Sequence, residues 1–448
     1  MIKQTAALLS VALLGLSTAA CGSNNNSESQ PSASGASPSA SEPASESASA
    51  SASASAEPVK LRIYAQYADD DTKLPYDYAV AELKKEMPNV ELELEIQAQD
   101  DGQKLKTYAA TGNLPDIFQA GLDIINTFKE SGNILQLDEY SDKYGFTDAV
   151  LPSAMNTLKT DDGHVYAFPY AGNEMILLYY NKELFEQNGV KVPTTFEEWQ
   201  QAVETFKKND IIPLALFAKE KWPDVALYDI FASRYDEAGI TKLDKGLAKA
   251  SDEAYKTAAE QLAALVKAGL LQKGATSMNY DQASALFFEG KAAMFLNGQW
   301  DIEASTNALG DKVDWMYYPG TDASNYESSK LVFSGGGGPG GYAVNPKSKN
   351  VEVAAEVAAF ISRKYAEFKY TERGTPIVAT KVDKEIVKAY PPMMEKLAQA
   401  IPNMKTTAFA WGLSNPKFKA AIEDASQGLM AGTTAEQFVK EVDKAIGQ

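Results

Sequence analysis

The sequence predicts an α/β protein with two lobes, each a mainly parallel sheet flanked by helices. Val59–Ala65 and Val90–Ile96 alternate apolar and polar residues, the period of two that is typical of strands. Segments with helical periodicity separate such strands, and Ser251–Ala268 is the clearest of them. Strands that alternate with helices favour parallel sheets covered by helices on both faces. The length of 448 residues exceeds what one hydrophobic core usually serves, so two lobes are expected.

Strands are expected where short apolar or alternating runs end at Gly, Pro or polar loops. In chain order they are Val59–Ala65, Val90–Ile96, Pro115–Gln119, His164–Tyr170, Met175–Tyr180, Pro213–Phe217, Ala292–Leu296, Trp315–Pro319 and Tyr342–Asn345. Pro169 lies inside the fourth run and restricts it to a sheet edge or a crossover, because Pro has no N–H to donate to a neighbouring strand.

Helices are expected between these strands and at the end of the chain. They are Tyr76–Met87, Lys104–Ala110, Asn181–Gly189, Thr195–Lys208, Ser251–Ala268, Ala283–Glu289, Val351–Phe368, Ile386–Ala400, Pro416–Met430 and Thr434–Ile446. Thr195-Phe-Glu-Glu198 is a capping box. Pro88, Gly269 and Gly290 mark helix ends.

Composition removes several classes of function. The formal net charge is -18, which argues against a nucleic-acid partner because binding phosphates needs clustered Lys and Arg. One Cys excludes disulfides within the chain and Cys-based metal sites. A single His, His164, disfavours His-metal clusters and His-dependent nucleophilic catalysis. Composition therefore removes several classes of enzyme but not those that use paired carboxylates. We expect no metal, no cofactor and no enzymatic activity.

The first twenty residues have the pattern of a secretory signal. Lys3 provides a basic start, Ala6–Leu16 is an apolar run too short to span a bilayer, and small residues precede Cys21. The pattern resembles a bacterial lipoprotein signal, cut before a Cys that carries diacylglycerol; ordinary cleavage beside an incidental Cys is the alternative. The resemblance implies a signal peptide over 1–20 and a protein lipid-anchored on the extracellular face of the bacterial cell membrane. Residues 21–57 are mostly Ser, Ala, Pro, Asn and Glu, which predicts a disordered tether.

The stretch Gly290–Asp301 is the most informative part of the body. Its buried strand ends in Asn-Gly-Gln-Trp, which places Trp300 just beyond the carboxyl end of a strand, where open α/β sheets bind ligands. A core position for Trp300 is the alternative. Trp222 is expected in a loop beside Pro223, where it is either functional or structural, whereas Trp199 lies on the apolar stripe of a helix and is read as core.

Three further segments are expected to be loops or turns, and the first has two open interpretations. The tract 334–341 holds six Gly, but no Gly-Lys-Ser/Thr follows it, so it is not a phosphate loop; it is either a loop that faces a ligand or a structural bend. Asp69-Asp70-Asp71 lacks the spacing of an EF-hand and is read as a solvated turn. Gly320–Ser329 is read as a polar loop.

Several motifs together resemble the extracellular solute-binding proteins of carbohydrate ABC transporters, family 1, of the maltose-binding-protein-like type. They occur in order from Lys60 to the C-terminus, and no single one is decisive. The motifs are Leu114-Pro-Asp-Ile-Phe118, Tyr166-Ala-Phe-Pro-Tyr170, Leu178-Tyr-Tyr-Asn-Lys-Glu-Leu-Phe185, Val192-Pro-Thr-Thr-Phe-Glu-Glu-Trp199, and Gly290-Lys-Ala-Ala-Met294 with Asn297-Gly-Gln-Trp300.

The resemblance implies a type II periplasmic-binding-protein fold, with a sugar held in a cleft between two lobes that close by a hinge of crossing segments. Those segments should lie near Ala167–Gly172, Tyr317–Gly320 and Gly374. It divides the chain after the tether into 58–168 and 318–373 for the first lobe, and 169–317 and 374–448 for the second. The implied partners are a carbohydrate, ABC permease subunits and the membrane, and the protein is expected to be a monomer.

The resemblance also implies which residues meet the sugar. In this family aromatic rings stack on sugar rings, while carboxylates and amides take the hydroxyls. Trp300 is the expected stacking residue and Glu174 the expected hydroxyl acceptor. Gln66 and Gln119 match hydrogen-bonding positions. The remaining expected contacts, with weaker support, are Asn173, Trp222, Asp301 and Trp411, and Arg373 is a further residue near them.

Other functions stay open at this point. Acids beside Trp also suit a cation, so a polyamine- or peptide-binding protein is one alternative. A secreted glycoside hydrolase is another, because sixty acids leave room for a suitably spaced pair of carboxylates.

Overall fold

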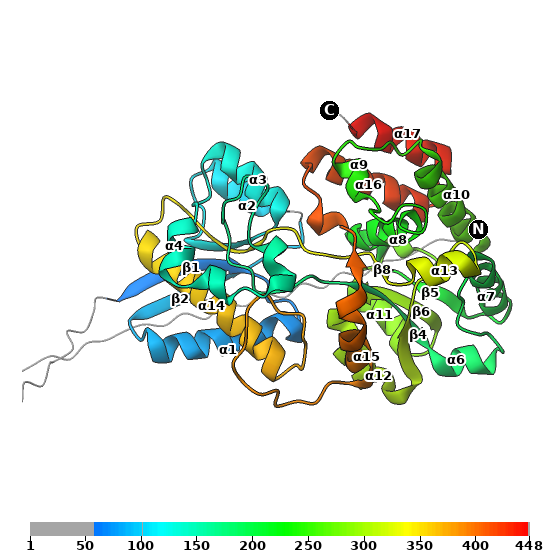
Figure 1. Cartoon of the computed structure of the whole chain (residues 1–448), viewed down its shortest axis with the longest axis horizontal. Helices are drawn as coiled ribbons and strands as arrows, with labels where there is room; N and C mark the ends of the chain where they lie inside the picture. Colours follow the sequence, from blue (N-terminus) through cyan, green and yellow to red (C-terminus); the bar gives the residue numbers. More distant parts are fainter. Residues whose placement is uncertain (1–57, 101, 447–448) are drawn as a thin grey trace, which may run out of the picture. The chain divides into compact units, whose positions relative to one another are not determined.

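We describe residues 58–100 and 102–446 from a computed structural model of the chain (Figure 1). The predicted signal peptide, Cys21 and the tether lie outside these residues. The body contains two separate four-stranded sheets, one of order β2-β1-β3-β9 and one of order β5-β6-β4-β7. Helices connect and cover the strands, so the predicted α/β class is confirmed. Within the described residues, no helix is long and apolar enough to cross a membrane.

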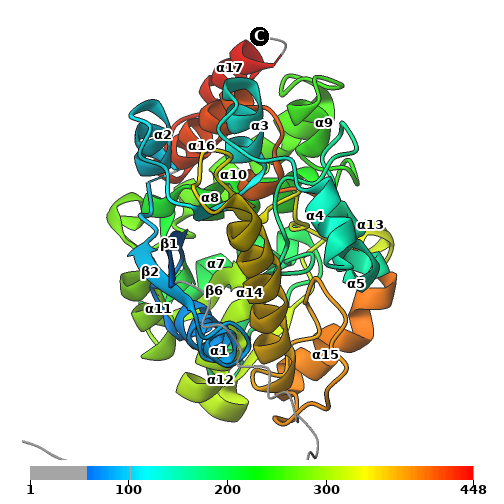
Figure 2. The ribbon, with the colours of Figure 1, turned by 90° about the vertical axis from the view of Figure 1, so that its left-hand side faces the viewer.

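The first sheet joins segments that are far apart in the sequence. Its strands are β1 (Val59–Ala65), β2 (Val90–Ile96), β3 (Ile117–Ala120) and β9 (Gly341–Val344). β1 is parallel to β2 and β3, whereas β9 is antiparallel to β3. The alternation in β1 supplies both faces of the sheet: Leu61 and Ile63 pack in one hydrophobic cluster and Tyr64 in another. Helices α1 (Asp70–Glu86) and α14 (Val351–Thr371) pack side by side (Figure 2).

The second sheet is built around β6 (Ala292–Gly298), all of whose residues are buried. Its other strands are β4 (Ile176–Asn181), β5 (Ile212–Ala215) and β7 (Val313–Met316). β5 runs parallel to β6, while β4 is antiparallel to both β6 and β7, so this sheet is mixed. The apolar run at the start of β6 is continuous because helices cover the strand on both sides.

The remaining elements are short strands and helices around the two sheets. They are β8 (Val332–Phe333), β10 (Lys405–Thr406), α2 (Gln103–Ala110), α3 (Leu122–Ser131), α4 (Asp138–Lys143), α5 (Phe146–Ala149), α6 (Lys182–Gln187), α7 (Phe196–Lys208), α8 (Trp222–Ala232), α9 (Thr241–Asp244), α10 (Glu253–Ala268), α11 (Tyr280–Phe288), α12 (Ile302–Leu309), α13 (Ala323–Ser329), α15 (Pro392–Ala400), α16 (Pro416–Met430) and α17 (Ala435–Ala445).

Backbone bridges tie the segments that run between the sheets. Phe168 pairs with Tyr342, Ala171 with Val378, and β8 with β10. Phe333 of β8 packs in the same hydrophobic cluster as the second sheet. The lobe limits and crossing points inferred from the resemblance stay a prediction.

Three local predictions were wrong. His164–Tyr170 forms isolated bridges rather than a strand, because Pro169 interrupts its hydrogen bonding. Gly320–Ser329 contains the helix α13, which Asp322 caps by accepting hydrogen bonds from the backbone N–H groups of Ser324 and Asn325. The helix expected over Ile386–Ala400 begins only at Pro392.

Candidate functional site

Three Trp side chains from distant parts of the chain form one cluster. The ring centroids of Trp222 and Trp300 are 5.8 Å apart, those of Trp222 and Trp411 are 5.2 Å apart, and those of Trp300 and Trp411 are 5.7 Å apart. The planes of Trp300 and Trp411 differ by only 21°, so these two rings face one another. Trp411 is 41% exposed, and Trp222 beneath it is 9% exposed. The cluster therefore presents an accessible apolar surface on a buried base.

The backbone before Trp300 determines where its ring lies. β6 ends at Gly298, and Gln299–Asp301 form a short 3-10 turn that leads into α12. A Cβ at position 298 would lie 2.1 Å from a ring carbon of Trp300, which no real contact tolerates. Gly298 is thus needed so that the ring can lie over the end of the strand.

Trp411 is positioned by a buried polar contact. Thr407, just after β10, donates its hydroxyl to the buried carboxylate of Asp229 and its backbone N–H to Phe333 O at 2.9 Å. Asp229 also accepts from the backbone N–H of Ile240 at 2.8 Å. Burial raises the pKa of Asp229 to about 6, and these hydrogen bonds oppose that rise. The chain that continues to Trp411 is therefore fixed to α8.

Trp222 is not in a loop, and that prediction was wrong. It is the first residue of α8, a position where the following Pro223 is favourable because it needs no N–H there. Glu220, two residues before it, accepts from the backbone N–H of Tyr280 at 3.0 Å, and Trp222 acts on its carboxylate. Burial raises the pKa of Glu220. The structure thus identifies Glu220 as a carboxylate close to the Trp cluster.

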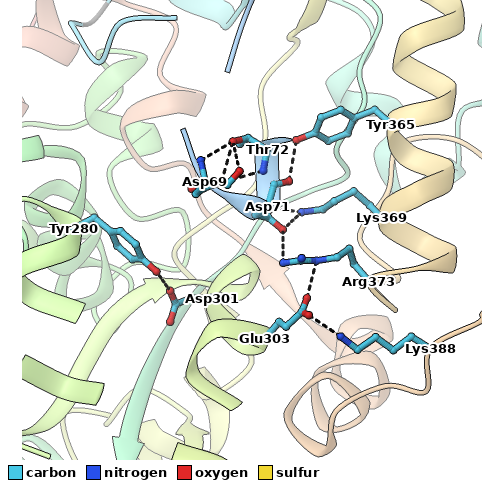
Figure 3. Close-up of polar contacts among 10 residues, drawn as sticks. All are labelled: Asp69, Asp71, Thr72, Tyr280, Asp301, Glu303, Tyr365, Lys369, Arg373 and Lys388. Carbon is cyan, nitrogen blue, oxygen red and sulfur yellow. Dashed lines mark hydrogen bonds and ion pairs between the residues drawn. The ribbon is translucent and has the colours of Figure 1, made fainter. Parts of the chain in front are cut away.

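Asp301 is buried and fully engaged within the protein. Its Oδ1 accepts from the Tyr280 hydroxyl at 2.7 Å (Figure 3). Oδ1 also accepts from the Asn297 amide at 3.0 Å, and Oδ2 accepts from the Ser305 hydroxyl at 2.6 Å. Burial raises its pKa to about 6, and the hydrogen bonds from Ser305, Tyr280 and Asn297 oppose the rise. This arrangement suits a residue that positions Trp300. A direct contact between Asp301 and a ligand stays a prediction.

Glu174 lies beside Trp300. The backbone N–H of Gln299 donates to Met175 O at 2.9 Å, and the Met175 N–H donates to the Gln299 side chain at 2.7 Å. These two bonds fix the segment of Glu174 and Met175 against the 3-10 turn that contains Gln299 and Trp300. Burial raises the pKa of Glu174 to about 7; Lys369 lowers it and Asp71 adds to the rise.

The Gly-rich tract packs against this same segment. Gly336 N–H donates to Glu174 O at 2.6 Å, and a Cβ on Gly335 would lie 2.3 Å from that oxygen. Asn173 accepts from Gly337 N–H at 3.1 Å and exchanges amide hydrogen bonds with Asn156 at 3.0 and 3.1 Å. The tract therefore permits close backbone approach beside Glu174, and the Asn173 amide supports it.

Gln66 follows β1, whereas Gln119 lies inside the neighbouring parallel strand β3, and the structure brings the two together. Gln66 N–H donates to the Gln119 side-chain oxygen at 2.7 Å. Gln119 is 6% exposed, and its amide nitrogen has no hydrogen-bond partner among the described residues. That nitrogen is buried, as well as unpaired within the described part of the chain, and a contact between Gln119 and a ligand stays a prediction.

Asp69 and Asp70 are exposed to solvent as predicted, but Asp69-Asp70-Asp71 begins a helix rather than forming a turn, so that part of the prediction was wrong. Asp69 caps α1 through a capping box, accepting from Thr72 N–H at 2.9 Å. Asp71 is in the first turn, where a carboxylate is favourable near the positive end of the helix. The acids therefore begin a helix. Figure 3 shows this end of α1 between Tyr280 and α14.

Ion pairs connect Asp71 to a chain of charges. Lys369 Nζ lies 2.5 and 2.6 Å from the Asp71 oxygens, and Arg373 Nη2 lies 3.7 Å from Asp71 (Figure 3). Arg373 Nε lies 2.6 Å from Glu303 Oε2, and Lys388 Nζ lies 2.6 Å from Glu303 Oε1. We call these five residues the charge network. It connects α1 and α14, which pack on the first sheet, with α12, which follows the second.

The sequence did not identify Tyr280, Glu220, Asp71, Glu303 or Lys369 as residues near the site. Asp71 had a local signal, since an acid in the first turn of a capped helix is recognisable from sequence. The others are ordinary helix residues, brought near the site only by tertiary packing. Among the described residues, no group of three or more His, Cys, Asp or Glu could hold a metal ion.

Two sheets, with ligand-type residues at the carboxyl ends of their strands, define a two-lobed α/β binding protein. The family model for bacterial extracellular solute-binding proteins matches residues 69–365, about two thirds of the chain. The chain belongs to that family, and the predicted family is confirmed. Members of this family are solute-binding proteins rather than enzymes.

Known proteins support the assignment. A probable sugar-binding periplasmic protein from Rhizobium meliloti is 27% identical over 226 residues, which cover 49% of this chain and 53% of that protein. The chain thus matches about half the length of this relative. A solved structure from work on xylan utilization by the thermophilic bacterium Caldanaerobius polysaccharolyticus is 27% identical, with a TM-score of 0.77 over 87% of this chain and all of that one.

A chitin oligosaccharide binding protein of known structure is 25% identical, with a TM-score of 0.74 over 86% of this chain and 98% of that one. These structural likenesses extend over nearly all of the described residues. They confirm the predicted two-lobed fold.

Proposed function

We propose that this protein is the substrate-binding subunit of an ABC importer, which captures a sugar or oligosaccharide and delivers it to the permease. The Trp cluster carries the proposal. Sugar rings have apolar C–H faces, and an exposed indole held rigidly by a buried base gives such a face a flat surface to stack on. Trp300 and Trp411 supply the accessible rings, and Trp222 supplies the base.

The polar groups around the cluster fit hydroxyl recognition. Glu174 beside Trp300 is a hydrogen-bond acceptor, and the Gln119 amide nitrogen is a donor without a partner among the described residues. A few convergent polar groups around an apolar floor orient a polyol. The sugar-binding relatives and the chitin oligosaccharide binding protein support the same ligand class.

The proposed place of action is the outer face of the cell membrane. Cys21 would carry the lipid anchor, residues 21–57 would act as the tether, and the protein would function as a monomer. Labelling with a palmitate analogue in wild-type and Cys21→Ser cells tests the anchor: label is expected only on the wild type, and equal label on both would contradict it.

A thermal-shift screen tests the function. A ligand that binds only the folded state raises the apparent Tm in proportion to the logarithm of its concentration over Kd. We expect at least one of xylotriose, chitotriose, maltotriose, cellotriose and raffinose to raise the Tm, with no sugar product formed during incubation. If none of these sugars raises the Tm and spermidine or a peptide does, the result contradicts the proposal. Turnover of a bound sugar would indicate a hydrolase.

A polyamine is the second candidate, because carboxylates beside Trp also suit a cation. Glu174 and Glu220 next to the Trp cluster favour it. Spermidine in the same screen separates the two ligand classes.

A further inference from the structure

We propose that this site accepts uncharged sugars and rejects sugars that carry a carboxylate, and that Glu174 is the residue that makes this distinction. The inference rests on the proposed sugar-binding function and names the charge class of its ligand. Four observations carry it: the place of Glu174, its surroundings, the pairing of the nearby cations, and the sign of the charges around Trp300.

Glu174 is fixed at the edge of the stacking surface. Its neighbour Met175 donates its N–H to the Gln299 side chain and accepts from the Gln299 N–H. The carbonyl of Glu174 accepts from Gly336 N–H at 2.6 Å. The close approach of Gly335 leaves this backbone no room to move away. A sugar ring stacked on Trp300 therefore brings its substituents to the Glu174 carboxylate.

The surroundings of Glu174 disfavour any additional negative charge. The Glu174 side chain is partly buried, and Asp71 acts on it with the same sign. Burial and this like charge together raise its pKa to about 7. A sugar hydroxyl donates to this group without adding charge, whereas a ligand carboxylate would be a second anion in the same poorly hydrated place.

The cations in the charge network are already paired with carboxylates. Lys369 acts on Glu174, but its Nζ lies 2.5 and 2.6 Å from both oxygens of Asp71. Arg373 is shared between Glu303 and Asp71, and Lys388 lies on Glu303 (Figure 3). An anionic sugar could pair with one of these cations only if that cation left its carboxylate partner.

The charges on the Trp side have the same sign. Glu220 lies two residues before Trp222, which acts on its carboxylate, and Asp301 lies directly after Trp300. No ion pair with either carboxylate occurs among the described residues. A site that leaves a ligand carboxylate without a partner discriminates against it by repulsion and desolvation, a common device of specificity.

The test compares a neutral sugar with its matched acid. With the purified full chain, titration calorimetry first identifies the tightest binder among maltotriose, cellotriose, chitotriose, raffinose and xylotriose. The matched acid is the same sugar with one C6 alcohol oxidised to a carboxylate. Because xylose has no C6 alcohol, the pair for xylotriose is the xylose chain with a terminal glucose and the xylose chain with a terminal glucuronate. We expect the acid to bind the wild type at least tenfold more weakly.

Two variants assign the discrimination. In Glu174→Gln the ratio of acid Kd to neutral Kd is expected to fall at least threefold, and Glu441→Gln, an exposed acid on α17, should leave it unchanged. Asp71→Asn removes a carboxylate from Lys369 and Arg373, so it should lower the ratio as well, and it serves if Glu174→Gln does not fold. In 0.5 M NaCl the wild-type ratio should also fall, because salt screens the repulsion.

The outcomes are distinct. An acid that binds the wild type within threefold of its neutral partner overturns the inference and leaves sugar binding intact. A ratio that stays unchanged in both site variants overturns the role of this charge cluster. If no sugar binds, the proposed function fails, and the inference fails with it.

Discussion

The two sides of the candidate site are built from different interactions. On one side, Trp222, Trp300 and Trp411 are held by ring packing and by buried hydrogen bonds. On the other, Asp71, Lys369 and the rest of the charge network are held by ion pairs between partly exposed groups. Aromatic contacts depend on buried area and shape, whereas partly exposed ion pairs are weakened by salt. The comparison teaches that affinity and charge selectivity can be changed separately.

Trp300→Ala should have the largest effect. Loss of a central aromatic contact commonly costs ~2–4 kcal/mol of binding free energy, so the sugar Kd should rise between roughly 30-fold and 1000-fold. Because this contact is apolar, 1 M NaCl should not reduce the loss. Calorimetry at two salt concentrations measures it.

Trp199→Phe is the matched control. Trp199 is 1% exposed in α7 and stacks on Phe231, so its change should lower the Tm and leave the sugar Kd unchanged. An affinity within threefold of wild type in Trp300→Ala would contradict the role given to the Trp cluster.

Asp301→Asn tests whether the aromatic side contains a buried titratable group. The folded pKa of about 6 lies above the unfolded value of about 3.9. The folded state therefore binds the proton more tightly, and the stability that this group contributes is lost as pH rises from about 4 to 6. The variant lacks this loss. Its free energy of unfolding relative to wild type should thus rise by about 2 kcal/mol between pH 4 and pH 7.

Urea unfolding at both pH values measures that difference. Asp314→Asn, at a partly exposed acid paired with Lys396, is a suitable control. A difference that stays constant with pH would mean that Asp301 is ionised at both pH values.

Gly298→Ala sharpens the aromatic side further. Its Cβ would lie 2.1 Å from the Trp300 ring, so the ring must move. We expect roughly tenfold weaker sugar binding, which corresponds to about 1.4 kcal/mol. Gly428→Ala in α16 should not change the affinity, and a Kd unchanged in both variants would show that the ring position does not matter.

Glu303→Gln should have the smallest effect, and it tests the charged side. It removes the carboxylate shared by Arg373 and Lys388, which connects α12 to α14. Pairs of this exposure contribute up to about 1 kcal/mol, so the Kd should rise by up to about fivefold at low salt. Fluorescence titration should find the effect lost in 1 M NaCl, unlike that of Trp300→Ala. An effect that persists in high salt would break the comparison between the two sides.

Local sequence patterns predicted much of the fold. The alternation of Val59–Ala65 and the apolar run of β6 defined strands, because a side chain's burial in a sheet depends on its place in the repeat. The capping box at Thr195 defined a helix start, and the structure shows a second capping box at Thr434. The sequence marked Pro169 as an interruption of its strand. It did not predict that the strand would be absent.

The sequence by itself determined the fold class, because strand and helix patterns are local, and the family, because its motifs are short and occur in order along the chain. It also placed Trp300 directly after a buried strand. Only the tertiary structure decided that Trp222 and Trp411 join Trp300, that Asp301 is buried among donors, and that Asp71 and Glu303 share Arg373. The physical reason is that these contacts join residues far apart in the chain. Such contacts form when whole elements pack and exclude water, which no local pattern of residues records.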